Sequence, residues 1–328
     1  MRAPCVRVPV EAGEATRRAL LEADLLAHDL AIEADEGWLY LPVTDAAAVS
    51  ADYDVEEREF APRETPTLPD DLLDGSASYE RVGDVVLLHE DDPERAQAVA
   101  EAVLASDLPV RTVLNRASEV KGVERVREWD VLAGGGTETV HTEYGCALAV
   151  DLARVYFSPR LATERQRVVA QVVPREHAFD MFAGVGPFAV RLADAGAEVV
   201  AVDVNPAAVE YLRTNAERNG VADRVTAIEA DVRDVADDYA GWADRVVMNL
   251  PHSADAFLDA AVTLAGDDCV VHYYDIQPEA DPYAAGEAAI RAAAGDAYDV
   301  TVEDRRVVRS YAPGMVNVCL DVRLTRRG

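Results

Sequence analysis

The segment 179–206 constrains the fold of this chain more than any other. It reads FDMFAGVGPFAVRLADAGAEVVAVDVNP, and its order is a short apolar run, a glycine turn, a helical segment, a second apolar run and a carboxylate, Asp203. Glycines let such a turn bend tightly and lie against a ligand. The distance from turn to carboxylate is close to the roughly 20 residues of a nucleotide-binding strand-helix-strand unit, in which the carboxylate accepts ribose hydroxyls. The segment therefore predicts an α/β fold with a nucleotide site beyond its first strand.

Small departures from the dinucleotide pattern favour a different ligand, S-adenosylmethionine. The third glycine of G-x-G-x-x-G is absent, and bulky Phe188 stands where a helix would have to approach a pyrophosphate. S-adenosylmethionine has no phosphate, and Asp180 before the turn could bind its ammonium group. The arrangement D-x-F-x-G-x-G-x-F, which includes Phe182, Gly184 and Gly186, resembles the first motif of class I methyltransferases. An ordinary strand-turn-helix remains the alternative interpretation.

The charge of the chain is strongly negative. The formal net charge is −30, and Lys121 is the only lysine among 31 basic residues. An acidic excess with arginine in place of lysine suits a high-salt cytoplasm. Such a charge ordinarily argues against nucleic-acid binding, because phosphates need cationic contacts. Molar salt shortens the reach of the global field to about 3 Å, so local arginines could still decide binding. A protein that simply avoids nucleic acid is the alternative.

Two further features of the sequence bound its class. No apolar run reaches the roughly 18 residues that span a bilayer, and the first residues lack the apolar core of a signal peptide, so we expect a cytoplasmic protein without a membrane partner. The four cysteines form no C-x-x-C pair and predict packing rather than a zinc site or disulfides. They are Cys5, Cys146, Cys269 and Cys319.

The chain divides by pattern into three folded parts and a linker. Residues 1–60 read as a small α/β module, and the proline-bearing, polar stretch 61–78 is the predicted linker. Residues 79–150 predict a middle α/β region with a Gly134-Gly135-Gly136 turn. From 151 to 328, strands and helices alternate, which predicts a parallel, Rossmann-like sheet. After the glycine turn we expect helices at 207–219, 254–264 and 284–294, and strands at 225–229, 245–249, 268–274, 299–306 and 317–323.

Polar residues follow two of the expected strands, where ligands bind in an open α/β sheet. Asn249, stiffened by Leu250-Pro251, could hold a planar base through its amide donor and acceptor. A loop that caps the next helix is the alternative, and His252 could be a base or a solvent-facing loop residue. Asp231, after the preceding strand, could accept the adenine amino group or cap a helix.

Aromatic, cationic and carboxylate groups also occur together just upstream of the glycine turn, in VYFSPRLATERQR. If a helix begins near Pro159, Arg160 and Glu164 lie four residues apart on one face, with Tyr156 before them. Taken alone, this spacing is more typical of an exposed helical ion pair than of a site.

These motifs together resemble those of the archaeal tRNA (guanine-37 N1)-methyltransferase family. The resemblance is carried by EYGCALAVDLARVYFSPRLATERQRVV, DMFAGVGPF, VDVNP, ADVRD, NLPHSA and VHYYDI. The flanks CVRVPVEAGEATRRALLEADLLAHDLAI and RRVVRSYAPGMVNVCLDVRL resemble the N-terminal module and the C-terminal end of that family. The resemblance covers nearly the whole chain. It implies a class I methyltransferase domain behind two smaller N-terminal modules, a monomer, and RNA binding, with the N-terminal module on the outer corner of tRNA and the anticodon loop at the active site.

The family resemblance also implies roles for individual residues. Glu164 would be the general base, Tyr156 and Asn249-Leu250-Pro251 would hold the target guanine, and Arg160 with Arg125 or Arg127 would position the base or its phosphate. The predicted cofactor-binding residues are Asp180, Phe182, Gly184, Gly186, Asp203, Asp231 and Asn249. The reaction as predicted requires no metal.

The chemistry agrees with these roles. Guanine N1 carries a proton at neutral pH and is a poor nucleophile until a base removes it. A donor aimed at O6 would then stabilise the developing charge by roughly 3 to 4 kcal/mol. Flipping the base out of its stack costs a few kcal/mol, part of which stacking on Tyr156 would offset.

Other activities compete with this interpretation. The nearest is transfer of the aminocarboxypropyl group by a wyosine-pathway enzyme of the same superfamily. The resemblance implies that those relatives carry glutamate at the position of Asp203 and lack the Asn-Leu-Pro element, so Asp203 and Asn249 favour methyl transfer. Methylation of a wyosine intermediate, a non-catalytic tRNA-binding protein and a small-molecule methyltransferase are the remaining alternatives.

Overall fold

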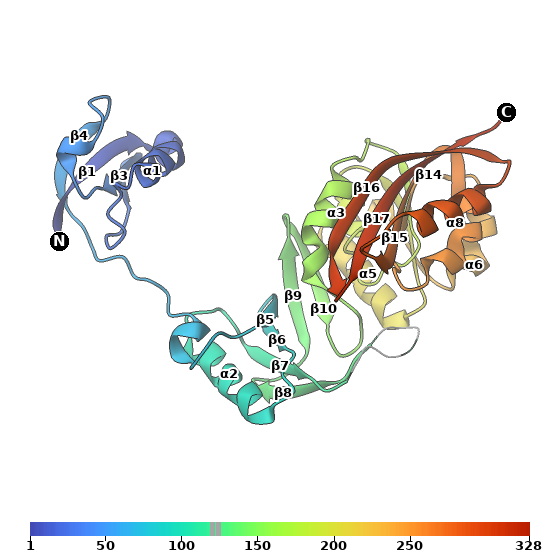
Figure 1. The fold of residues 1–328 in the computed structure, drawn as a ribbon, viewed down its shortest axis with the longest axis horizontal. Helices are drawn as coiled ribbons and strands as arrows, with labels where there is room; N and C mark the ends of the chain where they lie inside the picture. The colour runs from blue at the N-terminus through green and yellow to red at the C-terminus, as the bar shows by residue number, and fades with distance from the viewer. Residues whose placement is uncertain (119–121, 123–125) are drawn as a thin grey trace. The chain divides into compact units, whose positions relative to one another are not determined.

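A computed structural model describes residues 1–118, 122 and 126–328 of the chain. It divides into two compact units, Met1–Leu68 and Pro69–Gly328 (Figure 1). The predicted linker, 61–78, spans the boundary between them. In the part of the chain that is described, no helix is long and apolar enough to cross a membrane.

The N-terminal unit is a four-stranded antiparallel sheet with one α-helix, and its strand order is β2-β3-β1-β4. Its core contains Val6, Val8, Leu20 and Leu41. The elements are β1 (Arg2–Pro9), η1 (Val10–Ala12), α1 (Gly13–Glu22), β2 (Glu33–Asp35), β3 (Trp38–Pro42), η2 (Ala46–Ala48) and β4 (Asp54–Glu59).

The second unit begins with a small sheet of order β5-β6-β7-β8, covered by α2. Asp92 caps this helix by accepting from the Glu94 backbone N–H at 2.9 Å, and Pro93 occupies its first turn. The buried helix residues Val99 and Val103 recur at helical spacing and pack in the core of the sheet. The elements are η3 (Pro69–Leu72), β5 (Tyr79–Val82), β6 (Val85–Leu88), α2 (Pro93–Ala105), β7 (Thr112–Arg116) and β8 (Trp129–Ala133).

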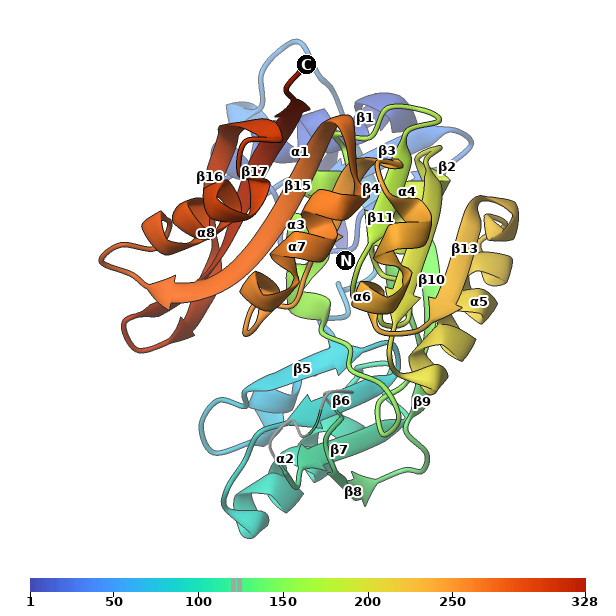
Figure 2. The same ribbon diagram turned by 90° about the vertical axis from the view of Figure 1, so that its right-hand side faces the viewer.

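A two-stranded hairpin, β9 (Glu138–Glu143) and β10 (Cys146–Asp151), follows the small sheet (Figure 2). At the end of β9, the buried carboxylate of Glu143 accepts from Arg165 at 2.8 and 2.6 Å and from Arg191 at 2.9 Å. Along β10, the Asn215 amide accepts from the Ala149 N–H at 2.7 Å and donates to its carbonyl at 3.0 Å. The hairpin is thus hydrogen-bonded to three helices of the C-terminal part, because Arg165, Arg191 and Asn215 all lie in helices.

The C-terminal part is a seven-stranded sheet of order β13-β12-β11-β14-β15-β17-β16. Figures 1 and 2 show its helices on both faces of the sheet. The strands are β11 (His177–Asp180), β12 (Glu198–Asp203), β13 (Val225–Glu229), β14 (Ala243–Met248), β15 (Ala265–Pro278), β16 (Tyr298–Ala312) and β17 (Met315–Arg326). The helices are η4 (Pro159–Leu161), α3 (Ala162–Val169), α4 (Ala189–Asp194), α5 (Pro206–Arg218), η5 (Ala222–Arg224), α6 (Val232–Val235), η6 (Ala236–Tyr239), η7 (Ala254–Phe257), α7 (Leu258–Leu264) and α8 (Ala284–Ala294).

Strand β12 shows why this sheet is buried on both sides. Val199 and Ala201 pack in one core with residues of α4 and α5, whereas Val200 and Val202 pack in the other core with residues of α7 and α8. Successive side chains of a strand point to opposite faces, so a continuous apolar run fits a sheet between two helical layers. The direction of chain progress reverses between β11 and β14, which places the ligand crevice at the carboxyl ends of those strands.

The predicted Rossmann-like α/β fold is confirmed, but the expectation of a wholly parallel sheet is wrong for its last strands. β13, β12, β11, β14 and β15 are parallel, whereas β17 is antiparallel to both β15 and β16. The cause is the short link between β16 and β17, Pro313-Gly314, in which Gly314 has φ +72°. Two residues can join antiparallel strands but cannot make the crossover that a parallel pair needs.

Candidate active site

A cavity of about 910 Å³ lies at the carboxyl ends of β11, β12 and β14, a volume within the range of small-molecule sites. Residues of the segment before α3, of the small β5–β8 sheet and of the C-terminal β16–β17 hairpin also line the cavity. Predicted site residues that line it are Tyr156, Arg160, Phe182, Gly184, Asp203, Asp231, Asn249, Leu250 and Pro251. Sequence motifs far apart in the chain therefore meet at one place.

The two glycines of the turn serve different purposes. Gly184, with φ +53°, lines the cavity, and a Cβ added to it would meet no atom closer than 3.9 Å. Gly186, with φ +88°, does not line the cavity, and a Cβ there would lie 2.4 Å from Cδ1 of Leu212 in α5. The first glycine therefore shapes the ligand surface, and the second allows α5 to pack against the turn.

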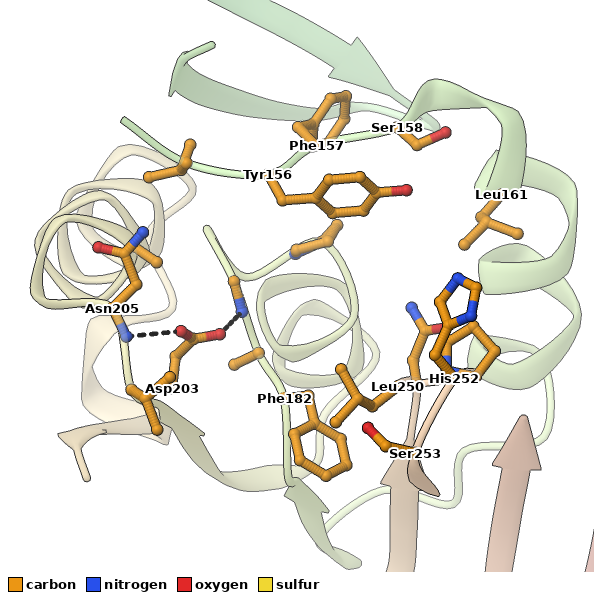
Figure 3. A pocket seen from close by; sticks show the side chains of 18 of the residues that line it. Tyr156, Phe157, Ser158, Leu161, Phe182, Asp203, Asn205, Leu250, His252 and Ser253 are labelled. Atoms are coloured by element: carbon orange, nitrogen blue, oxygen red, sulfur yellow. Dashed lines mark hydrogen bonds between the residues drawn. The ribbon is translucent and has the colours of Figure 1, made fainter. Parts of the chain in front are cut away.

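Asp203 at the end of β12 is held in place by two backbone amides. Its carboxylate accepts from the Gly184 N–H at 2.7 Å and from the Asn205 N–H at 2.9 Å (Figure 3). Asn205 is itself fixed, because it caps α5 through the Ala207 N–H at 2.9 Å and donates to the Arg154 carbonyl at 2.9 Å. A carboxylate has about four acceptor positions, so an oriented Asp203 can also accept ribose hydroxyls.

Asp180, the last residue of β11, is 1% exposed and is not part of the cavity lining. One oxygen accepts weakly from the Phe182 N–H at 3.4 Å, and Oδ2 is buried without a hydrogen-bond partner among the described residues. Burial raises the pKa of Asp180 to about 7, and the nearby charge of Asp203 adds to this rise. A buried, unsatisfied carboxylate oxygen close to Asp203 fits the ammonium group of S-adenosylmethionine.

Asp231 both lines the cavity and caps a helix. Its carboxylate accepts from the Arg233 N–H at 3.0 Å, at the start of α6, and from Nε of the same arginine at 2.9 Å. The helix cap, which was the alternative interpretation of Asp231, is thus present, and the cofactor role stays a prediction. The Arg233 guanidinium lies 4.6 Å from the ring centroid of Phe257, which packs edge-on against Phe182 at 5.0 Å. These aromatic rings give one side of the cavity an apolar surface suited to a purine.

Arg160 is paired with the small sheet rather than with its helical neighbour. Its guanidinium forms an ion pair with Glu80 of β5, and Glu164 pairs with Arg167, so the alternative interpretation of Arg160 and Glu164 as a helical ion pair does not hold. Burial opposes the charged form of Glu80, but His89 and the Arg160 guanidinium outweigh burial and lower the pKa of that carboxyl group. Tyr156, 39% exposed, lines the same region of the cavity.

The Asn249 segment reaches the cavity as expected. Asn249 follows β14 directly, and Figure 3 shows Leu250 and His252 together with Tyr156 and Phe182 in the pocket lining. The His252 ring lies edge-on to Tyr311, with centroids 5.3 Å apart and the Tyr311 hydroxyl 3.3 Å from Nε2. His252 therefore belongs to the wall of the cavity.

Glu164, the predicted base, is not brought to the cavity lining. It is 6% exposed, and its Oε1 accepts from the Tyr274 hydroxyl at 2.9 Å and from Nη2 of Arg167 at 2.7 Å. Of the two candidate substrate arginines, Arg127 lines the cavity, whereas Arg125 lies outside the described residues.

Several lining residues were not predicted from the sequence. Glu80 comes from β5, and Arg309, Tyr311 and Asn317 come from the β16–β17 hairpin. One signal was present in the sequence: Asn317 interrupts a strand that is otherwise mostly apolar, VNVCL, and a polar residue in a buried strand needs a partner.

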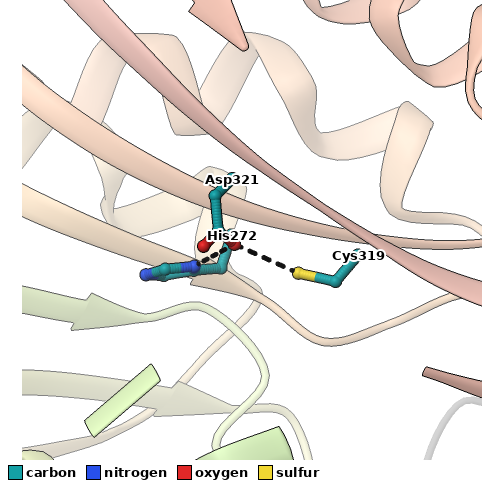
Figure 4. A group of neighbouring side chains, drawn as sticks. All are labelled: His272, Cys319 and Asp321. Atoms are coloured by element: carbon teal, nitrogen blue, oxygen red, sulfur yellow. Dashed lines mark hydrogen bonds and ion pairs between the residues drawn. The ribbon is translucent and has the colours of Figure 1, made fainter. Parts of the chain in front are cut away.

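All four cysteines are buried free thiols, as predicted, and one belongs to a group with metal-ligand chemistry. The ligand atoms of His272, Cys319 and Asp321 lie within 4.8 Å of one another (Figure 4). However, His272 donates from Nδ1 to Asp321 at 2.7 Å and accepts at Nε2 from Arg245 at 2.6 Å. Burial opposes ionisation of Asp321, but His272 and Arg167 hold the pKa of this carboxyl group well below its usual range. Arg167 already pairs with Asp321, and Arg245 already donates to His272. We therefore interpret His272, Cys319 and Asp321 as part of a hydrogen-bonded polar network within the core.

Family models match three consecutive parts of the chain. The TRM5/TYW2 methyltransferase domain matches residues 139–302, the tRNA methyltransferase 5 N-terminal domain matches residues 5–51, and the TYW2 N-terminal domain matches residues 65–137. The methyltransferase match includes the glycine turn, Asp203 and Asn249.

Individual relatives agree with these matches. The tRNA (guanine(37)-N(1))-methyltransferase Trm5b of Pyrococcus abyssi is 37% identical over 98% of each chain. The tRNA(Phe) (4-demethylwyosine(37)-C(7)) aminocarboxypropyltransferase of Pyrococcus horikoshii is 34% identical over 81% of this chain and 95% of its own. A solved complex of aTrm5 and tRNALeu is similar in fold, with a TM-score of 0.71, 33% identity and coverage of 98% and 99%. The predicted resemblance is confirmed, and the chain belongs to the TRM5/TYW2 methyltransferase family.

Proposed function

We propose that this protein transfers the methyl group of S-adenosylmethionine to N1 of guanosine 37 in tRNA. The observation that carries the proposal is a single cavity in which Gly184 and Asp203 adjoin Tyr156, Arg160 and Asn249. The first two suit an adenosyl cofactor, and the last three suit a planar base. Similarity to Trm5b over nearly the full length of both chains supports the same activity.

Three carboxylates divide the work of binding the cofactor. Asp203 accepts the ribose hydroxyls in the orientation that the Gly184 and Asn205 amides impose. The unsatisfied Oδ2 of Asp180 receives the ammonium group, and Asp231 accepts the adenine amino group. When bound, S-adenosylmethionine supplies a methyl group already activated by its sulfonium. The remaining task of the protein is to place the base in line and remove its proton.

The cavity also offers what a flipped guanine needs. Tyr156 stacks on the base, and the amide of Asn249 holds its edge, with Leu250-Pro251 fixing the loop. Arg160, together with Arg127 or Arg125, supplies positive charge for the base or its phosphate. A cation or amide donor directed at O6 stabilises the charge that develops as N1 loses its proton.

Glu164 accepts the N1 proton in this proposal. In the structure its carboxylate is bound to Arg167 and Tyr274 instead, one helical turn beyond the cavity residues Arg160 and Leu161. A local shift around α3 on substrate binding exposes this carboxylate to the base, while Tyr274 and Arg167 keep it oriented. Catalytic hydrogen bonds that form only in the substrate complex are common, so this arrangement is compatible with general-base catalysis.

The proposal also assigns a role in tRNA binding or catalysis to each part of the chain. The anticodon loop enters the cavity, while the N-terminal module, residues 1–60, recognises the outer corner of the tRNA. The middle region, 79–150, is an accessory RNA-binding domain, and 151–328 is the catalytic domain. The enzyme acts as a monomer in a high-salt cytoplasm, where the net charge of −30 is strongly screened.

A methylation assay tests the proposal. The protein is incubated in high salt with methyl-labelled cofactor and tRNA transcripts carrying guanosine or adenosine at position 37, and the product nucleoside is mapped. Only the guanosine transcript should become labelled, at N1; labelling of both or of neither refutes the proposal. Glu164→Gln should lower the rate roughly 10²- to 10⁴-fold with cofactor binding retained. Loss of cofactor binding instead would contradict the assignment of Glu164 as the base.

Aminocarboxypropyl transfer is the second candidate, because a family model of the TYW2 N-terminal domain matches residues 65–137. The same assay separates the two activities when the label is placed in the aminocarboxypropyl group. Transfer of that label, without transfer of methyl, would replace the proposed reaction with this one.

A further inference from the structure

The C-terminal hairpin brings two polar side chains to the cavity that the proposed function leaves without a role. In the antiparallel register, Arg309 of β16 lies directly opposite Asn317 of β17. Opposed residues on neighbouring strands share a face of the sheet, and both of these residues line the cavity.

Both side chains carry a buried atom without a hydrogen-bond partner. Asn317 is 2% exposed, and its Oδ1 has no partner among the described residues; the same is true of Nε of Arg309. Leaving such an atom unsatisfied is unfavourable, because it has lost its hydrogen bonds to water without gaining others. One acceptor and one donor are therefore unsatisfied at adjacent positions of the same wall.

Another buried polar residue of this face, Asp321, is fully hydrogen-bonded, in contrast to the pair. Alternate residues of β17 share a face, so Asp321 follows Asn317 along the same surface. Asp321 accepts from His272 at 2.7 Å, from Arg167 at 3.0 Å and from Gln171 at 3.0 Å. Polar groups on this surface are thus satisfied away from the cavity and unsatisfied at the cavity, as expected where a ligand completes the hydrogen bonds.

Charge places Arg309 beside the predicted substrate residues. Glu80, which forms an ion pair with Arg160, also interacts electrostatically with Arg309. Both arginines therefore lie near one carboxylate, at the wall of the cavity that the proposed function assigns to the base.

A donor and an acceptor close together match one edge of guanine in particular. The proposed function already assigns N1 to proton removal and methyl transfer and O6 to a cation or amide donor, and the N7 side offers only acceptors. On the sugar edge, the 2-amino donor is adjacent to the N3 acceptor. We propose that Asn317 accepts a hydrogen bond from the guanine 2-amino group and that Arg309 donates to N3, an assignment that rests on the proposed function.

Substrates that lack the 2-amino group test the contact of Asn317. The kcat/KM of the full-length chain is measured with tRNA transcripts that carry guanosine or inosine at position 37. Inosine should cost the wild-type protein about tenfold, the effect of one buried hydrogen bond, and should cost Asn317→Ala less than about twofold. An equal inosine penalty in both proteins, or none in the wild type, would overturn the proposal.

Asn317→Leu, of similar size and without an acceptor, replaces the alanine variant if the smaller side chain prevents folding. It should show the same loss of discrimination while cofactor binding stays within about twofold of wild type. A wild-type protein that methylates neither transcript would refute the proposed function and this contact with it. Methylation of guanosine 37 with an unchanged inosine penalty in the Asn317 variants would refute only the contact.

Arg309 has a matched control on its own strand. Arg306 is exposed, pairs with Asp304 at 3.6 Å and does not line the cavity. Arg309→Ala should lower kcat/KM for the guanosine transcript about tenfold, whereas Arg306→Ala should change it less than about twofold. Equal effects of the two substitutions would show that Arg309 acts only through general charge and would contradict its contact with the base.

Discussion

Arg167 forms a two-pronged ion pair with Glu164, with Nε 3.0 Å from Oε2 and Nη2 2.7 Å from Oε1. The same guanidinium contacts Asp321 of β17, with Nη2 3.0 Å from Oδ1. Burial opposes the charge of Arg167, but its contacts with Glu164 and Asp321 outweigh burial and raise the pKa of the guanidinium well above its usual range. The proposed base is therefore tied to the core network through a cation that stays charged.

Removal of the Tyr274 hydroxyl should slow methyl transfer. This hydroxyl donates to Glu164 at 2.9 Å, and Tyr274→Phe deletes the contact while the ring keeps its packing. We expect kcat to fall about five- to tenfold, since one buried hydrogen bond to a charged group is lost, with the KM for cofactor unchanged. Tyr298→Phe is the control, because it also deletes a buried tyrosine hydroxyl. Tyr298 donates to the Ala265 carbonyl at 2.6 Å and lies in the core on the other side of the sheet, with residues of α7 and α8. An equal loss of kcat in the two variants would mean that both act through stability.

Cofactor affinity should increase with pH around neutrality. Because burial raises the pKa of Asp180 to about 7, this carboxyl group is half protonated there, and only its ionised form pairs with an ammonium group. The dissociation constant should fall by up to about tenfold per pH unit below that value and then level off. Titration calorimetry from pH 6 to 8 measures it, and Asp180→Asn should bind weakly with no such dependence. The same pH profile in this variant would exclude Asp180 as its origin.

The same carboxyl group should reduce stability as pH rises. Its pKa in the folded protein lies above the ordinary value of 3.8, so the folded state holds the extra proton between about pH 4 and 7. The free energy of unfolding should therefore fall across that window. Above pH 7, Asp180→Asn should be more stable than wild type in urea unfolding. A less stable variant at pH 8 would show that ionised Asp180 is satisfied in the folded protein.

The two glycines of the turn should differ in their tolerance of a side chain. Gly186→Ala places a Cβ 2.4 Å from Leu212 at φ +88°, whereas the Cβ of Gly184→Ala, at φ +53°, meets no atom closer than 3.9 Å. Both substitutions carry a backbone cost of roughly 1 to 2 kcal/mol, but only the first adds a clash. Thermal unfolding should show the larger loss for Gly186→Ala, and cofactor titration the larger relative effect for Gly184→Ala. A reversed order of stability would contradict the packing role of Gly186.

Salt should stabilise this protein. The formal net charge of −30 produces repulsion that mobile ions screen, so the unfolding midpoint should rise between 0.1 and about 2 M KCl. Calorimetry at both salt concentrations measures the change. A fall in the midpoint would show that the exposed ion pairs stabilise the fold more than the net charge destabilises it.

Local patterns predicted those parts of the fold whose signals are contiguous in sequence. The expected strand 225–229 and helix 284–294 coincide with β13 and α8. The late strands, expected at 299–306 and 317–323, extend to 298–312 and 315–326, because pairing in the hairpin sustains residues whose own pattern is irregular. Long-range pairing therefore set the bounds that local preference left open.

The site, too, was predictable only where its residues belong to recognisable local motifs. Gly184, Asp203 and Asn249 follow strands whose carboxyl ends must meet, so their convergence could be expected from sequence order. Asn317 and Arg309 reach the cavity only through the register of an antiparallel hairpin, which no motif specifies. The ion pair between Glu164 and Arg167 likewise depends on which face of α3 meets the sheet.

The contacts of the β9–β10 hairpin bear on how the domains of this family can be separated. Glu143 forms ion pairs with Arg165 and Arg191, which are 2% and 3% exposed. A fragment that begins at residue 151 would keep both arginines and lose their carboxylate, and an uncompensated buried charge costs about 3 to 5 kcal/mol. The hairpin should therefore melt together with the C-terminal sheet. In a chimaera of two relatives, the exchanged modules should fold only if the junction precedes residue 138. The hairpin and the C-terminal sheet then come from the same protein, and Glu143 keeps its two arginine partners.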